Sequence, residues 1–492
     1  MKRIGILSAL FAVIASAAAQ TSTNPPAGRT MSLQDCIQAA LAHNFDVQIE
    51  RYNPQISLYN LNAAYSGYDP TFNISGQHDY NSSGVDGYPP STSKENSFKS
   101  DIGGSLPWGL QYDFIGNIAN QYGGTLYSGT NQSSGGSIQA KLTQPLLKNF
   151  WIDNTRLNIR VAKNRLKYSE QGLRQQLITS VTAVANAYYE LIYAQQNVQV
   201  QQEALNLSQT QLDQDNQRLQ IGTLAVLSVQ QDESQVAQNK ANLIAAQSTL
   251  DTDQNALKNL LTDEYSQWHD TDIQPTETLL APSQSFDLQG SWTEGMAKRP
   301  DLLQAKLNVE QQGIQLKYYR NQLFPELDLI GTYGFNGAGA QYSGAFGQYN
   351  EGDRPFYSYG AQLSVPLGNL GPRNQYKANK VTLQQVVLQL KQLEQNVLVQ
   401  IDNAVKQAES AYQSAEATKQ ARISAEAALD AEQKTYAVGK ATTFEVLTYQ
   451  NNLTTARSAE IRALANYNEA IANLAQQEGS TFEHYHINLE AK

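Results

Sequence analysis

The chain carries one pattern of landmarks twice. Asp46 to Pro70 and Asp301 to Pro325 have the same length and lie 255 positions apart. In each copy, alternating apolar residues follow the proline, and then come a second proline, a very long helical stretch, a glycine and a return helix. A unit duplicated on this scale is expected to fold twice in a similar way. The sequence therefore predicts two structural repeats that mix helices with strands.

The landmarks also predict where each repeat begins and ends. We expect the first repeat over 31–262, a linker over 263–290, the second repeat over 291–478 and a tail over 479–492. Each repeat is predicted to hold an opening helix (Leu33–Ser66 in the first), strands (70–147 and 326–366), a long helix (156–221 and 373–438) and a return helix (225–261 and 441–476). The helix–strand junctions are marked by Pro70, Pro145, Pro325 and Pro366.

The segment from Arg156 to Ile221 has no proline and a single glycine. At 1.5 Å per residue it predicts one helix about 100 Å long. Apolar residues recur at every seventh position from Leu177 to Leu219, which imposes left-handed supercoiling against neighbouring helices. The second seam of the heptad repeat is occupied by the amides Gln195, Gln202 and Gln209. This favours a helix packed laterally in a wall with water on two sides; an ordinary solvated coiled coil is the alternative.

The segments between the prolines are predicted to be strands. Their lengths match the roughly 9–11 residues of a membrane β-strand, although a soluble sandwich would alternate in the same way. We expect a turn at Gly129–Gln132 and a loop at Gly337–Arg354. The predicted strands are Thr71–Tyr80, Phe98–Leu106, Gly109–Ile118, Ser137–Leu146, Glu326–Phe335 and Tyr357–Val365.

So few strands cannot close a barrel, and an open sheet edge cannot face lipid. Other copies must complete the wall, so a closed cyclic homo-oligomer is expected. Three copies supply twelve strands if the Phe98–Ile118 hairpin lies outside the wall, and eighteen if it joins.

The first 19 residues have the form of a secretory signal peptide, with Lys2 and Arg3 before an apolar run and a small-residue cleavage site. Removing those two cations takes the formal charge from −10 to −12, which disfavours a nucleic-acid partner. No later stretch is apolar enough for a membrane-spanning helix. The single cysteine, Cys36, cannot form an internal disulfide and is predicted to be a small buried residue of the opening helix.

Four short motifs, each weak alone, occur in one order and in duplicate: Arg299–Leu302, Phe324–Leu327, Gln144–Leu147 and Val365–Gly368. Together they resemble the TolC-like outer-membrane efflux proteins over essentially the whole mature chain. The resemblance implies a trimeric outer-membrane β-barrel continued by an α-helical coiled-coil barrel across the periplasm. It implies an exit duct of a tripartite efflux or type I secretion system, passing small molecules or protein. The implied partners are outer-membrane lipid, a periplasmic adaptor and an inner-membrane pump of the RND, ABC or MFS class.

The resemblance also implies functional helix tips. The tip residues that would contact the adaptor are Ile221, Gly222, Thr223, Val438 and Gly439, and the glycines permit a tight turn.

A periplasmic gate is implied at Glu445, with Lys440 beside it. Two positions depart from the family pattern, since Thr448 stands where a second acid is common and Ala441 replaces the tip arginine. The gate would then rest on one ring of carboxylates. A merely solvated tip residue is the alternative for Glu445.

The sequence shows no phosphate-binding loop and no nucleophile elbow, so neither an enzyme nor a cofactor is expected. His484 and His486 lack carboxylate or thiol company, so we expect a solvated tail rather than a metal site. A secreted coiled-coil structural or adhesive protein remains the alternative to an export duct. A porin is disfavoured because porins keep their strands contiguous.

Overall fold

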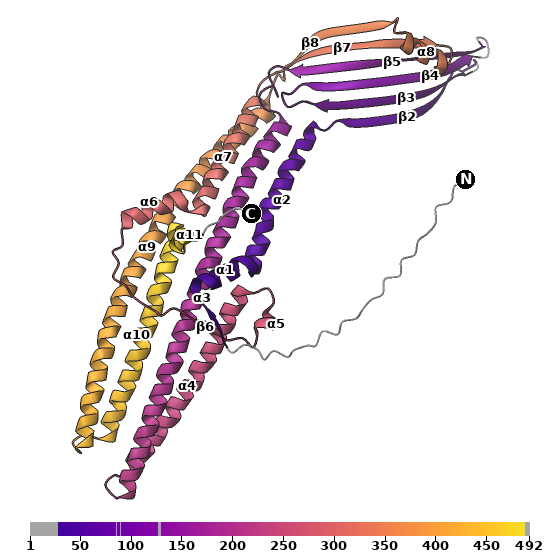
Figure 1. Cartoon of the computed structure of the whole chain (residues 1–492). Helices are drawn as coiled ribbons and strands as arrows, with labels where there is room; N and C mark the ends of the chain where they lie inside the picture. Colours follow the sequence, from indigo (N-terminus) through magenta and orange to yellow (C-terminus); the bar gives the residue numbers. More distant parts are fainter. Residues whose placement is uncertain (1–27, 85, 89, 126–128, 488–492) are drawn as a thin grey trace, which may run out of the picture.

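Two helices of exceptional length form the spine of the molecule. They are α3 (Asn154–Gln220) and α9 (Leu370–Ala437), and they run from a β-sheet at one end to two tips at the other (Figure 1). The computed structural model describes residues 28–84, 86–88, 90–125 and 129–487, so the predicted signal peptide lies outside the described residues. Asp153 caps α3, its side chain accepting from the backbone N–H of Arg156 at 2.7 Å.

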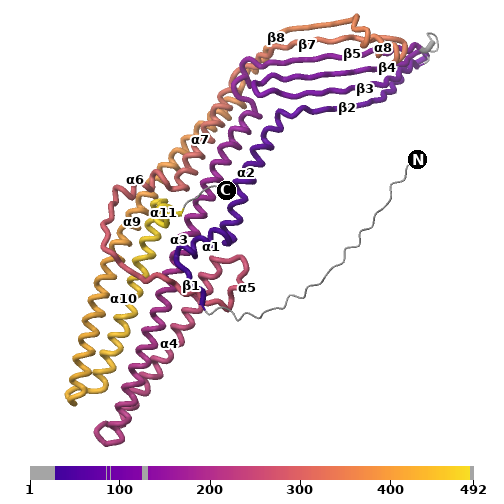
Figure 2. Tube along the Cα trace, viewed as in Figure 1, coloured from indigo at the N-terminus to yellow at the C-terminus, as the bar shows by residue number. Residues whose placement is uncertain are grey.

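Shorter helices pack along each long helix. The return helices α4 (Val226–Leu261) and α10 (Thr443–Glu478) cover the half nearest the tips, and the opening helices cover the half nearest the sheet (Figure 2). An opening and a return helix together therefore match the length of one long helix. Within the described chain, no helix is long and apolar enough to cross a bilayer.

The prediction of one continuous opening helix is wrong. The first repeat has α1 (Leu33–His43) and α2 (Phe45–Ala64), separated at Asn44, whose side chain accepts from the N–H groups of Asp46 and Val47. The second repeat has α6 (Leu288–Lys298) and α7 (Pro300–Asn321), separated at Arg299. Arg299 forms a bidentate ion pair with Asp301 and also donates to the Gln477 carbonyl, which ties this break to the end of α10. Both breaks are held by polar contacts.

Small elements lie at the middle of the helical region, which we call the waist. They are β1 (Arg29–Met31), α5 (Tyr265–Trp268), β6 (Ile273–Pro275) and α11 (Thr481–His484). A further short helix, η1 (Tyr65–Tyr68), connects α2 to the sheet. β1 and β6 pair in parallel. Residues Arg29–Met31 and the predicted linker therefore meet on the surface of α3.

All six long strands form one antiparallel sheet in the order β2-β3-β4-β5-β7-β8. The predicted Phe98–Ile118 hairpin is therefore part of this sheet. Within the described chain β2 and β8 each have a neighbour on one side only. The strands are β2 (Thr71–Ser83), β3 (Ser91–Ser105), β4 (Gln111–Thr125), β5 (Gly129–Pro145), β7 (Glu326–Gly339) and β8 (Pro355–Ser364).

Two local predictions in the sheet are wrong. The expected turn at Gly129–Gln132 belongs to β5, because β4 and β5 pair out to Thr125 and Gly129. The expected loop at Gly337–Arg354 contains the end of β7 and a helix, α8 (Tyr342–Glu351). In both places the strands extend beyond the length that a bilayer requires.

The two faces of the sheet differ in polarity. Alternate residues of a strand point to opposite faces, and paired residues share a face. One cross-strand row joins Phe72, Ile102, Phe114, Tyr333 and Tyr357 on a face that we call the apolar band. The opposite face, mostly polar, carries Asn73, Ser75, Lys99, Asp101, Asn117, Gln139, Lys141, Thr332 and Ser358.

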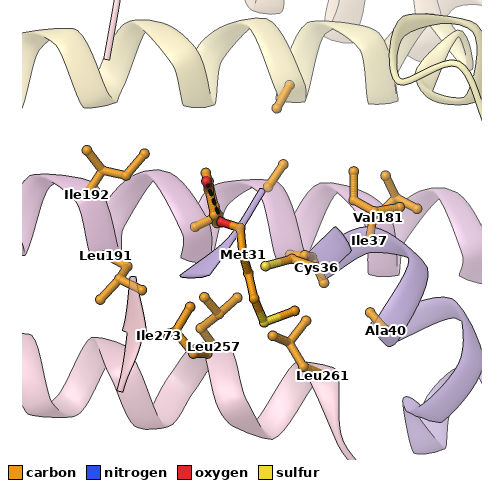
Figure 3. Close-up of a cluster of buried hydrophobic side chains, with 14 of the residues drawn as sticks. Met31, Cys36, Ile37, Ala40, Val181, Leu191, Ile192, Leu257, Leu261 and Ile273 are labelled. Atoms are coloured by element: carbon orange, nitrogen blue, oxygen red, sulfur yellow. Dashed lines mark hydrogen bonds between the residues drawn. The ribbon is translucent and has the colours of Figure 1, made fainter. Parts of the chain in front are cut away.

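The main hydrophobic core lies at the waist, where α1, α3, α4 and the β1–β6 pair meet (Figure 3). Leu191, Leu257 and Leu261 are fully buried there. Cys36 is buried in α1 as predicted, and burial raises the pKa of its thiol to about 12. The prediction of a solvated C-terminal tail is wrong for 481–487, because Phe482 and Tyr485 pack against α3.

Candidate functional site

The two helix tips have the same backbone geometry. Gly222 and Gly439 adopt φ values of +76° and +73°, the left-handed region that glycine enters without strain. Each glycine N–H donates three residues back, and the next residue donates five residues back, from Thr223 to Arg218 and from Lys440 to Thr435. This pair of hydrogen bonds defines a Schellman motif, which satisfies the last carbonyls of α3 and of α9. The tight turns leave both tips projecting from the end of the molecule (Figure 1).

The tips expose apolar side chains. Ile221 and Val438, two of the predicted adaptor-contacting residues, are 74% and 69% exposed. Sequence analysis missed three exposed neighbours on the return helices, Val226, Leu227 and Phe444. All three lie within six sequence positions of a tip glycine. That short separation in sequence was the signal that could have identified them. Exposed apolar side chains clustered at an end of a molecule are typical of a protein-binding surface.

Glu445 lies in the first turn of α10 and forms a capping box with Thr442. Its carboxylate accepts from the Thr442 backbone N–H at 2.7 Å and from the Thr442 hydroxyl at 2.9 Å. These hydrogen bonds lower the pKa of Glu445, so the exposed side chain is an anion at neutral pH. Lys440 is also exposed, and the Thr448 hydroxyl donates to the Phe444 carbonyl. Glu445 therefore stabilises its own helix, whichever way its charge faces in an assembly.

Just above the tips, a buried polar cluster joins the two helix pairs. Its centre is Asp215 of α3, which is fully buried. The hydroxyl of Tyr436 in α9 donates to both Asp215 oxygens, at 2.8 and 2.7 Å, and Thr443 of α10 donates at 3.3 Å. Gln211 donates from one turn earlier, at 2.9 Å. One carboxylate thus holds residues of three helices together.

A second buried acid, Asp232 of α4, faces Asp215. Burial and then the negative charge of Asp215 raise the pKa of Asp232 to about 7. Among the described residues neither Asp232 oxygen receives a hydrogen bond from a donor. Arg218 provides the neighbouring positive charge, 3.6 Å from Asp215 and over the Tyr436 ring at 4.5 Å. Two buried acids with one cation nearby favour the protonated form of Asp232.

Sequence analysis missed this cluster. One buried stripe of α3 runs from Ala204 through Ser208, Gln211 and Asp215. The heptad position of Ala204 was therefore a signal for the buried cluster.

The amide-rich sequence of this segment of α3 was instead interpreted as a face of the helix in contact with solvent. Of the three amides predicted to face water, Gln202 and Gln209 are exposed. The prediction is wrong for Gln195, which is half-buried and donates to the Ile273 carbonyl at 3.2 Å.

The four junction prolines lie where helices meet strands. Pro70 immediately precedes β2 and Pro325 immediately precedes β7. Pro145 is the last residue of β5, and Pro366 lies two residues beyond the end of β8. All four therefore lie at the end of the sheet that is joined to the helices.

Among the described residues, no group of three or more His, Cys, Asp or Glu side chains is placed to hold a metal ion. His484 lies at the end of α11 with its ring against Tyr485, and burial lowers its pKa. The features described above are those of a conduit: a two-faced sheet, an elongated helical body and a pair of exposed tips.

The chain belongs to the outer membrane efflux protein family. The family model matches residues 36–262 and 294–480, which form the two predicted repeats almost in full. This confirms the resemblance drawn from the motifs. Proteins of this family are channels of the bacterial outer membrane, and the chain is assigned to that membrane with its helices extending into the periplasm.

Similar proteins include TolC of Escherichia coli, 25% identical over 294 residues, or 59% of each chain. BepC of Brucella suis, an outer membrane efflux protein, is 24% identical over 68% of this chain and 70% of its own. The match therefore spans less than two thirds of the TolC sequence.

Solved structures show the same fold. A Pseudomonas aeruginosa membrane protein superposes with a TM-score of 0.67 at 17% identity, covering 91% of this chain and 92% of its own. The outer membrane protein VceC of Vibrio cholerae gives 0.66 at 17% identity, covering 92% and 96%.

Proposed function

We propose that the chain is the exit duct of a tripartite efflux or type I secretion system, assembled as a homotrimer. The observation that carries this proposal is the six-stranded sheet, apolar on one face and polar on the other, with edges at β2 and β8. In a membrane the open edges must be paired. Pairing β8 of one copy with β2 of the next closes a ring in which the apolar band faces lipid and the polar face lines a water-filled lumen.

Three copies give a wall of eighteen strands, because β3 and β4 belong to the sheet. Barrels of that size leave an aqueous channel. The same three copies bring twelve helix rows around the periplasmic tunnel, so one continuous passage runs from the tips to the exterior.

The exposed tips support docking to a periplasmic adaptor. Gly222 and Gly439 let a partner approach the backbone closely, and Ile221, Thr223 and Val438 present side chains beside them. The adaptor connects the duct to an inner-membrane pump, which selects the compound. The duct itself transports small molecules or protein through a lumen that makes few specific contacts.

Gating is proposed at the same end. Glu445 side chains from three copies would form a negative ring at the periplasmic entrance, with Lys440 nearby. The Asp215 cluster would hold the α9–α10 pair against α3, so releasing it is the step that opens the entrance.

Light scattering of the detergent-purified protein tests the assembly. We expect a particle of about three times the 54.3 kDa chain, less the signal peptide, that resists dissociation by SDS. A stable monomer would overturn the proposal, because one sheet cannot close on itself. Loss of export on deleting the reading frame, restored by the wild-type copy, would connect the trimer to transport.

A further inference from the structure

A short helix lies on the apolar band at the end of the sheet far from the tunnel helices (Figure 1). This helix, α8, buries Ala345 completely. Glycines of the sheet make room for it: a Cβ atom on Gly337 would overlap with the Ala345 carbonyl oxygen, and one on Gly136 would overlap with the Tyr349 hydroxyl. Gly136 and Gly337 are paired neighbours in the row that also holds Ile118, so α8 covers the apolar face.

Specific hydrogen bonds fix the helix in place. Tyr342 donates to the Asn96 carbonyl of β3 at 2.9 Å, and Tyr349 donates to the Asn117 carbonyl of β4 at 3.2 Å. The Ala338 N–H of β7 donates to the side chain of Gln348 at 2.8 Å. The helix is thus docked on three strands rather than tethered by its ends alone.

A cleft opens between α8 and the sheet. Its volume is about 220 Å³, and its apolar walls are formed by Ile74, Phe98, Ile138, Phe346 and Tyr349. Phe346 projects from α8, 53% exposed, at the mouth of the cleft. A groove of this composition suits a hydrocarbon chain, and an exposed phenylalanine beside it costs free energy in water.

The position of α8 coincides with the outer rim of the apolar band. Beyond the row of Phe98 and Ile118, the next row on the same face is polar, with Asn96 paired to Asn120. One row further out, Lys94 lies between its strand neighbours Tyr80 and Tyr122, with its ammonium over the Tyr80 ring at 5.8 Å. Aromatic residues and a cation at this level are typical of the membrane interface.

We propose that α8 and the cleft beneath it form a binding site for lipid A, the phosphorylated and multiply acylated lipid of the outer leaflet. One acyl chain occupies the cleft against Phe346 and Ile138, and a phosphate lies within reach of Lys94. The continuity of the cleft with the apolar band supports a lipid occupant, and the outer position of Lys94 supports an anionic head group. The proposal rests on the barrel arrangement given above.

Spin labelling tests where α8 lies. A Cys36→Ala background carries one label at Phe346→Cys, at Leu363→Cys on the apolar band, or at Ser358→Cys on the polar face. Trimers are reconstituted into phosphatidylethanolamine bilayers containing purified lipid A. We expect the labels at 346 and 363 to collide more often with oxygen than with an aqueous nickel chelate, and the label at 358 to show the reverse.

The three labels separate two kinds of failure. A label at 363 that collides with the aqueous chelate contradicts the barrel, and with it the proposed function. A lipid-facing 363 with a water-facing 346 overturns only the lipid site.

Competition between lipids tests the head group. Lys94→Gln should lower the lipid A retained per purified trimer about fivefold relative to phosphatidylglycerol, as expected for one cation near the surface. Lys141→Gln, which removes a cation from the polar face, is the matched control and should change nothing. Equal retention in wild type and Lys94→Gln, or an equal loss of both lipids, would overturn the assignment to lipid A.

Discussion

The waist and the tips of the helical region are built from the same helices but have different interiors. At the waist, α3 buries Val184, Tyr188 and Leu191 against α1 and α4. Near the tips, the same helix buries Gln211 and Asp215. Burial of a large apolar side chain contributes about 1.5–3 kcal/mol, and a hydrogen bond to a charged group contributes a similar amount. When the helices separate, however, water can replace the hydrogen bonds but cannot replace the apolar contacts. The contacts at the waist should therefore be harder to separate than those at the tips.

A polar interior also makes the tip contacts directional. Tyr436 and Thr443 reach Asp215 only when the two helix pairs lie in one register. Losing the contact exposes groups that water can solvate, so an opened tip costs less than an opened apolar core. This difference is consistent with the proposed opening at the tips, with the waist as the fixed end of each long helix.

The largest expected effect comes from the waist. Leu191→Ala should destabilise the protein by about 2–5 kcal/mol, because it leaves a cavity in a fully buried site. Leu205→Ala, two heptads nearer the tip on the same seam and only half-buried, should cost clearly less. Chemical denaturation followed by circular dichroism measures both variants. Equal losses of unfolding free energy in the two variants would show that the waist and the tips do not differ in stability.

The next effect is a pH dependence of the tips. Asp232 has a pKa of about 7 in the folded protein against an ordinary value of 3.8. Between these values the folded state holds a proton that the unfolded state has lost. Stability of the packed tips therefore falls as pH rises from about 4 to about 7, and is level above that. The tips should be tighter at pH 5 than at pH 8.

Distance measurements between spin labels at Thr223→Cys and Lys440→Cys check this prediction. The distribution should be narrow at pH 5 and broader at pH 8. Asp232→Asn mimics the protonated acid and should keep it narrow at both values, whereas Asp213→Asn, on the exposed side of α3, should leave the pH response intact. A response that survives Asp232→Asn would exclude this carboxyl as its source.

Removing one hydroxyl group should loosen the tips without affecting the waist. Tyr436→Phe deletes the donor to Asp215, a hydrogen bond to a charged group that contributes about 1.5–3 kcal/mol. Amide hydrogen exchange in 443–453 should accelerate, and exchange near Leu257 should not. Tyr412→Phe, in the same long helix but with its ring packed beside Tyr467 and away from Asp215, is the control. Uniform acceleration along the helices would contradict a separate tip unit.

A smaller effect is expected at the turns. Gly439→Val places a β-branched residue at φ +73°, which costs about 1–2 kcal/mol. Export should be lost while the yield of trimer stays near normal. Gly313→Val is matched, because it also adds a side chain to open space but in ordinary helical backbone. Unchanged export in the Gly439→Val strain would show that these glycines only terminate their helices.

These comparisons also explain which features the sequence could predict. The long helices and the junction prolines depend on local rules, namely heptad spacing and the positions of Pro70 and Pro325. The break at Asn44 had a local signal, because asparagine is a common helix cap, but its second contact, with the distant Leu260 carbonyl, could not be predicted. α8 was missed because its two glycines weaken the local helix signal and its contacts with the sheet join residues far apart in the sequence. Asp215 was missed because its partner, Tyr436, lies 221 positions away.

The smallest structural effect is expected at Glu445, where charge and capping can be separated. Glutamine also serves in a capping box, so Glu445→Gln keeps the hydrogen bonds to Thr442 and removes only the charge. If three such carboxylates surround the entrance, cation selectivity in planar-bilayer recordings should fall a few-fold, and block by multivalent cations should weaken. Both changes should shrink at high salt, where the Debye length is short. Thr448→Asp adds a second acid one turn along and should strengthen the block. Unchanged selectivity in Glu445→Gln would mean that the residue only caps α10. Opening of the tips would then depend on their polar interior and not on a ring of charges.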